Sequence, residues 1–223
     1  MLPPDTTVRL SREQLADLDA AVADAPNEAV LQETLYRLCR EYPGHADRAA
    51  AHAKVLLIGR GLATGIERLL ISRGGQGGTM LALAAHLHDR HEQADAILDS
   101  LRPVEEPLDL GGLRTIVEAH GRFCRLLQPV LRKSVLRKKQ SARSFAAKYL
   151  HCHCPAVPIF DSYTRDKLER LVTWQDRFQV FDRPADADEM YFWFVLRFWQ
   201  LYQAAREPRP GVNVWLLDLY LLR

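Results

Sequence analysis

The stretch 143–161 carries the residues whose types and spacing best suit chemistry. Ser144 can cap a short helix, and Pro155 and Pro158 then end that helix and impose an extended crossing. Asp161 follows at the start of the next helix, where the positive end of the helix dipole stabilises a carboxylate. Such a carboxylate can stabilise positive charge on a reacting group or activate water. The alternative interpretation is that Asp161 only caps its helix.

A long basic block surrounds this stretch. No acidic residue occurs between Ala119 and Phe160, whereas nine Lys and Arg residues do. The rest of the chain therefore holds the other 21 basic residues and all 28 acidic ones. A block of one sign indicates a polyanionic partner such as nucleic acid, or a solvated face. We predict that part of the block grips a nucleic-acid backbone. The block holds nine bases: Arg122, Arg125, Arg132, Lys133, Arg137, Lys138, Lys139, Arg143 and Lys148.

Apolar residues recur at helical spacing along nearly the whole chain, so the predicted class is all-α. A capping box at Ser11–Gln14 predicts a first helix that ends at Pro26, and a second helix from Asn27 would stop at Pro43. The chain is expected to form one all-α domain, 1–223, and two helical lobes that meet near residue 105 are equally compatible. Further helices are predicted at 45–71, 79–101, 113–131, 143–153, 162–178, 187–206 and 212–222.

The basic helix, the Pro-Ala-Val-Pro-Ile crossing and the helix-initiating Asp161 resemble the end of the catalytic motif in helix-hairpin-helix DNA glycosylases, particularly the 8-oxoguanine type. The resemblance covers about 30 residues near 135–165, and the all-helical length fits it. It implies that Asp161 assists cleavage of the glycosidic bond of a flipped, damaged or modified base. A weaker similarity is to glycosylase-like proteins of bacterial anti-phage operons.

The sequence departs from that family at three places. The family's hairpin contains a Gly-x-Gly turn, whereas 138–143 has no glycine. Its lysine nucleophile should fall near 142–144, where no lysine stands; Lys148 or Lys139 could substitute, and a Schiff base with strand cleavage would then follow. The cysteine quartet of an iron–sulfur cluster is missing. We therefore expect a divergent member with no cofactor, in which a lyase step depends on those lysines.

Two further groups of residues suggest sites. Arg60, Thr64 and Arg68 recur every four residues on the predicted helix 45–71, so we expect them to point one way, either into close helix packing or toward substrate as a pocket wall. His151–Cys154 alternates potential metal ligands, and a packed helix end with half-buried thiols is favoured over zinc. The face with His88 and His91 is expected to be solvated, and no metal is predicted.

Composition sets the remaining expectations. With 48% hydrophobic and 26% charged residues, the chain suits a globular domain and not a disordered one. No apolar run approaches the ~18 residues of a membrane span, and 1–7 does not resemble a secretion signal, so a cytoplasmic protein without membrane contact is expected. The predicted function is excision or recognition of a flipped base in DNA, in the context of anti-phage defence. The alternative is a non-catalytic helical module that binds nucleic acid or a protein through the basic surface of 119–160.

Overall fold

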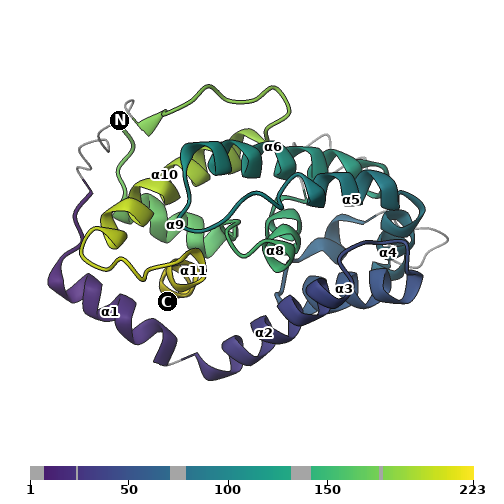
Figure 1. Ribbon diagram of the computed structural model, residues 1–223, viewed down its shortest axis with the longest axis horizontal. Coiled ribbons are helices and arrows are strands. Elements are labelled where there is room, and N and C mark those ends of the chain that lie inside the picture. The colour runs from purple at the N-terminus through teal and green to yellow at the C-terminus, as the bar shows by residue number, and fades with distance from the viewer. Residues whose placement is uncertain (1–7, 24, 71–78, 132–141, 176–177) are drawn as a thin grey trace.

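The computed structural model describes residues 8–23, 25–70, 79–131, 142–175 and 178–223 (Figure 1). Within these ranges it contains ten α-helices, two short 3-10 helices and no strand, so the all-α prediction is confirmed. The elements are α1 (Arg12–Ala23), α2 (Pro26–Glu41), α3 (Arg48–Gly61), η1 (Ile66–Leu69), α4 (Met80–Asp89), α5 (His91–Asp99), α6 (Leu110–Leu127), η2 (Gln128–Val130), α8 (Arg143–His153), α9 (Ser162–Leu171), α10 (Glu189–Arg206) and α11 (Val214–Leu222).

Side-chain caps start many of these helices. The predicted capping box of α1 is confirmed: the Ser11 amide donates to Gln14 Oε1 at 2.8 Å, and the Gln14 amide donates to Ser11 Oγ at 3.1 Å. At later helices the N-cap side chain likewise accepts a hydrogen bond from a backbone amide of the first turn, and these N-caps are Asp47, Thr79, Asp109, Asp161, Asp188 and Asn213. Short polar residues ahead of apolar periods therefore set most of the observed boundaries.

Several predicted boundaries are wrong. The helix expected at 45–71 ends at Gly61, because Ala63 and Gly65 adopt positive φ angles of 48° and 65°. The helix expected at 79–101 is broken at Arg90, whose φ of −117° lies outside the helical range. The helix expected at 162–178 already ends at Leu171, and α2 begins at Pro26, ahead of Asn27.

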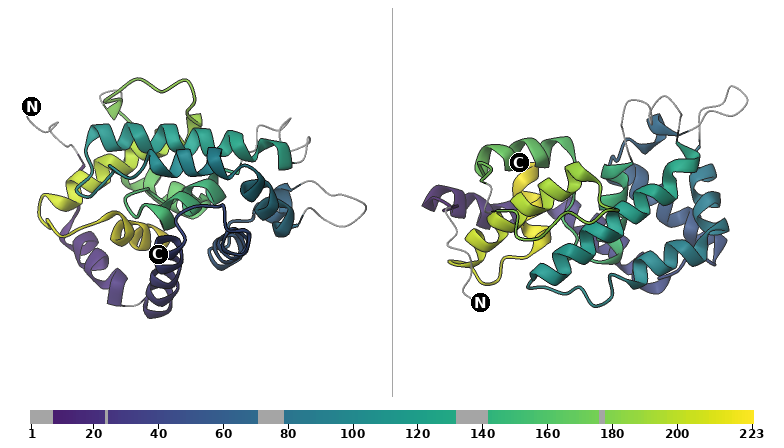
Figure 2. Two further views of the ribbon diagram at one scale, coloured as in Figure 1. Left: turned by 45° about the vertical axis from the view of Figure 1, so that its right-hand side comes forward. Right: turned by 90° about the horizontal axis from the view of Figure 1, so that it is seen from above.

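Helix α8 occupies the centre of the fold (Figures 1 and 2). It packs against α2, α3 and α6, and every residue from Phe145 to Cys152 is buried. Helix α9 packs against both α10 and α11, while α3 and α4 form another closely packed pair. Close packing explains Gly59 of α3, where an added Cβ would lie 2.0 Å from Met80 Cε. No helix in the described ranges combines the length and the apolar character needed to cross a membrane.

Candidate functional site

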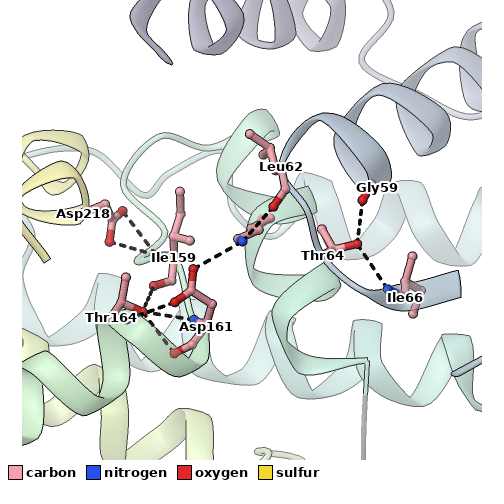
Figure 3. Close-up of polar contacts among 9 residues, drawn as sticks. Gly59, Leu62, Thr64, Ile66, Ile159, Asp161, Thr164 and Asp218 are labelled. Carbon is pink, nitrogen blue, oxygen red and sulfur yellow. Dashed lines mark hydrogen bonds and ion pairs between the residues drawn. The ribbon is translucent and has the colours of Figure 1, made fainter. Parts of the chain in front are cut away.

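Lys148 lies on the buried central helix α8, an unusual place for a charged side chain. Its residue is 8% exposed, and its neighbours on both sides in the sequence, Ala147 and Tyr149, are fully buried. A buried ammonium is stable only with hydrogen-bond acceptors and a counter-charge within reach. The structure supplies both, one from the end of α3 and one from the start of α9 (Figure 3).

The first acceptor is a backbone carbonyl just beyond α3. Lys148 Nζ donates to the Leu62 carbonyl at 2.8 Å. Leu62 is the C-cap of α3, and its carbonyl lies among the last ones of the helix, which lack intrahelical donors. The early end of α3 therefore provides the acceptor that holds the lysine in place.

The counter-charge is Asp161, which the segment 154–160 delivers to Lys148. The extended crossing predicted after Pro155 is wrong for the first half of this segment, where the Val157 amide donates to the Cys154 carbonyl at 3.0 Å and closes a turn. Asp161 Oδ2 lies 3.3 Å from Lys148 Nζ, and the two side chains are 15% and 10% exposed. Asp161 Oδ1 accepts from the Thr164 amide at 2.9 Å, and the Asp161 amide donates to Thr164 Oγ1 at 3.0 Å, which completes a capping box at α9. The predicted N-cap is thus confirmed, and the carboxylate has a second partner that the sequence did not reveal.

Three buried side chains fix the crossing segment ahead of Asp161. His151 Nδ1 donates to the Val157 carbonyl at 2.7 Å, and Tyr191 Oη donates to the Pro158 carbonyl at 2.9 Å. The Ile159 amide donates to both carboxyl oxygens of Asp218, at 3.2 Å each. Because the backbone is held on both sides, the Asp161 carboxylate has a defined position relative to Lys148.

Two of these groups titrate far from their ordinary ranges. Burial raises the pKa of Asp218 well above its ordinary value of 3.8, and the nearby negative charge of Asp161 adds to that increase. Burial lowers the pKa of His151 to about 4, so the imidazole is neutral near pH 7. Its Nδ1 carries the proton donated to Val157, and its Nε2 accepts from Tyr36 Oη at 2.6 Å.

The structure does not bring Arg60, Thr64 and Arg68 onto one face. Arg60 and Arg68 are exposed, and Arg60 pairs with Glu67 at 2.8 Å. Thr64 is buried and donates to the Gly59 carbonyl at 2.9 Å. The expected common face is wrong because α3 ends before Thr64, and the local turn directs these side chains apart.

The basic block is described only in part. Lys133, Arg137, Lys138 and Lys139 lie outside the described residues. Arg143 is described, and its side chain is 16% exposed and forms a two-pronged ion pair with Asp188, with Nη2 at 2.8 Å from Oδ2. DNA contact by any of these five residues stays a prediction.

The His–Cys stretch is packed into the protein. Cys152 and Cys154 are buried, and burial raises the pKa of the Cys154 thiol to about 11. Among the described residues, no three His, Cys, Asp or Glu side chains are placed to hold a metal ion together. His88, expected on a solvated face, is half-buried instead, and its Nδ1 contacts the His45 carbonyl oxygen at 3.0 Å.

Sequence reasoning missed Asp218 and the network around His45. Asp218 is the only acid in the apolar run 214–222, and a lone acid in such a run indicates a buried partner. His45 is fully buried between Asp95, at 2.6 Å from its Nδ1, and the Tyr149 hydroxyl, at 2.7 Å from its Nε2. The sequence separations of 50 and 104 residues give no local pattern for this network.

Comparison with known proteins gives no relative: no family model, no curated protein and no solved structure matches this chain.

Proposed function

We propose that this protein is a DNA glycosylase-like enzyme that hydrolyses the bond between sugar and base of a flipped nucleotide, with Asp161 as its catalytic carboxylate. The observation that carries the proposal is the ion pair between Lys148 and Asp161, which is nearly excluded from water and joins the central helix to the start of α9. The two residues came from one sequence motif, and the folded chain places them 3.3 Å apart.

The proposed reaction uses the carboxylate for charge stabilisation and proton transfer. As the base departs with the electron pair of the C–N bond, positive charge develops on the sugar, and a fixed carboxylate stabilises that charge. Water then forms the new C–O bond at the same carbon and gives one proton to Asp161. The departing base takes up a proton from solvent, so the products are the free base and an abasic site.

Lys148 acts in this proposal as a positioning residue and not as the nucleophile. Its ammonium donates to the Leu62 carbonyl and faces Asp161, so no nitrogen lone pair is directed at a substrate. The lysine ammonium lies against one carboxylate oxygen of Asp161, and the Thr164 amide donates to the other, so both oxygens are held in place. Base release without a lysine adduct follows from this arrangement.

A second candidate function, nucleic-acid binding without catalysis, is favoured by one observation. Both oxygens of Asp161 already have partners within the protein, and the side chain is only 15% exposed. In that case the pair would be a structural tie between α8 and α9, and the basic block alone would carry the function.

The test is a panel of duplexes, each with one damaged or modified base, incubated with the wild-type protein. Alkali treatment reveals abasic sites, and borohydride trapping reveals covalent adducts through a Schiff base. The proposal expects abasic sites on at least one duplex and no strong adduct. Efficient trapping that is lost in Lys148→Ala would make the lysine the nucleophile and overturn the hydrolytic step. Binding without release on every duplex would establish the second candidate.

A further inference from the structure

A hollow of about 320 Å³ lies between the start of α5 and the end of α6, apart from the Lys148–Asp161 pair. Three arginines line it, Arg90 at the junction of α4 and α5 and Arg122 and Arg125 on α6. No acidic side chain lines it, and the remaining lining residues are Gln93, Ile97, Leu126 and Pro129. We call this feature the arginine groove.

Two of the arginines are held in place by protein groups, Arg122 by a neutral hydroxyl and Arg125 by a backbone carbonyl and a carboxylate. Arg122 Nη2 donates to Ser100 Oγ at 2.8 Å, while the serine hydroxyl donates its own proton to the Ile97 carbonyl at 2.6 Å. Arg125 Nη1 donates to the Asp186 carbonyl at 2.8 Å, and its Nη2 pairs with the Asp186 carboxylate at 2.8 Å. These contacts hold two of the side chains that line the groove in defined positions, which lowers the entropic cost of binding a ligand there.

The groove keeps an excess of positive charge. In the described part of the chain, neither Arg90 nor Arg122 forms an ion pair with a carboxylate, and Arg122 Nε is buried without a hydrogen-bond acceptor. Asp89 and Glu92 flank Arg90 but line the adjoining hollow beside His86 and His91. Since buried N–H groups are nearly always paired, the unpaired Arg122 nitrogen marks a place where an acceptor is missing.

We propose that the arginine groove binds a phosphodiester group of a nucleic-acid strand. Guanidinium groups donate two parallel hydrogen bonds to phosphate oxygens, a geometry that arginine provides and lysine does not. The apolar side chains of Ile97, Leu126 and Pro129 offer a surface for the sugar next to that phosphate. A strand is favoured over a free phosphate because the sequence continues, from 132 to 141, with five bases and no acid.

This proposal does not depend on the proposed catalysis, because the groove and the Lys148–Asp161 pair share no residue. The test compares Arg90→Gln, Arg122→Gln and the double variant with Arg114→Gln. Arg114 lies on the same helix α6 as Arg122, but it is exposed, pairs with Glu118 and does not line the groove. Fluorescence anisotropy of a labelled 20-base-pair duplex is measured over a potassium chloride series.

Each groove arginine that contacts a phosphate should lower the slope of log affinity against log salt by about 0.9 when it is removed. Affinity at low salt should fall about tenfold for each arginine, whereas the Arg114→Gln control should match wild type. An unchanged slope and affinity in the double variant would overturn the proposal. Tighter binding of inorganic phosphate by wild type than by the double variant, with equal duplex affinity, would assign the groove to free phosphate instead.

Two measurements keep the result interpretable. The exposed Arg90→Gln change tests the groove by itself if Arg122→Gln lowers the thermal unfolding midpoint, since Arg90 makes no side-chain hydrogen bond in the described residues. Asp161→Asn should keep the wild-type salt slope. No base release by wild type on any duplex, with a salt slope that still falls in the groove variants, would count against the proposed enzyme only. Base release by wild type, with an unchanged slope in the double groove variant, would count against the groove only.

Discussion

Removing the charge of Asp161 should destabilise the protein through Lys148, although the helix cap survives. In Asp161→Asn the amide oxygen can still accept from the Thr164 amide, and Asn is as good an N-cap as Asp, so capping alone predicts a change of no more than about 1 kcal/mol. The ammonium of Lys148, however, keeps only the Leu62 carbonyl as an acceptor.

The expected magnitude follows from the burial of the pair. Exposed ion pairs contribute about 0.2–1 kcal/mol, whereas removing one partner of a fully buried pair costs about 3–5 kcal/mol. With side chains 10% and 15% exposed at 3.3 Å, the Lys148–Asp161 pair lies between these limits. We expect the free energy of unfolding to fall by about 2 kcal/mol in Asp161→Asn and by a similar amount in Lys148→Met.

A double-mutant cycle isolates the pair. Unfolding by urea is followed through the fluorescence of the four tryptophans for wild type, both single variants and the double variant. The double variant should be little less stable than either single variant, which corresponds to a coupling energy of about 1–2 kcal/mol. The matched control is the exposed pair Arg114–Glu118, for which about 0.3–0.5 kcal/mol is expected. A Lys148–Asp161 coupling no larger than that of the control would refute this reasoning.

Three further predictions concern packing and protonation. Gly121→Ala places a Cβ 1.9 Å from the Asp186 carbonyl oxygen and should lower the urea-derived stability by about 2 kcal/mol, whereas Gly211→Ala, with open space, should change it by less than about 0.5 kcal/mol. Asp218 has a raised pKa, so its contribution is present below pH 3.8 and lost as pH rises through the folded-state pKa; Asp218→Asn should therefore gain stability relative to wild type between pH 4 and pH 8. Three buried histidines have a pKa lowered to about 4: His45, His120 and His151. Between pH 6.5 and pH 4 the unfolded chain therefore binds protons that the folded chain excludes, so the free energy of unfolding should fall by about 1.4 kcal/mol per pH unit for each histidine. Constant stability over that range would contradict the lowered pKa values.

The sequence predicted the class and most helix positions because apolar periodicity and capping residues are local. The helix Arg143–His153 and the cap at Asp161 came from neighbouring residues and are confirmed, whereas the predicted cap at Ser144 is wrong, because the helix begins at Arg143 with Ala142 as its N-cap. The break at Arg90 was missed because no glycine or proline marks it. The end of α3 at Gly61 was missed although glycines stand at 61 and 65, because apolar residues continue at helical spacing beyond it and the positive φ of Ala63 is unusual for its residue type.

The candidate site could be predicted only as far as it is local in sequence. Asp161 was identified from the crossing and the helix start, whereas its contact with Lys148 depends on how α8 packs against that crossing. Leu62, whose carbonyl accepts from Lys148, lies 86 residues before it in the sequence. Asp218, which accepts from the Ile159 amide, lies 59 residues after it. No sequence pattern links two groups over such separations. Long-range packing therefore completes the site.

The central claim is that the Asp161 carboxylate releases a base from DNA, and single-turnover base release tests it most directly. Wild type, Asp161→Asn and Asp166→Asn are compared on a duplex from which wild type releases the base, at a temperature where all three are folded and bind DNA equally. Asp166 is the matched control because it lies on the same helix α9, its side chain is 55% exposed, and it forms an ion pair with its sequence neighbour Arg165 and not with Lys148. We expect Asp166→Asn to react at the wild-type rate. Asp161→Asn should react more slowly than wild type by a factor on the order of 10² or greater. Asp161→Asn that releases the base at the wild-type rate would contradict the account.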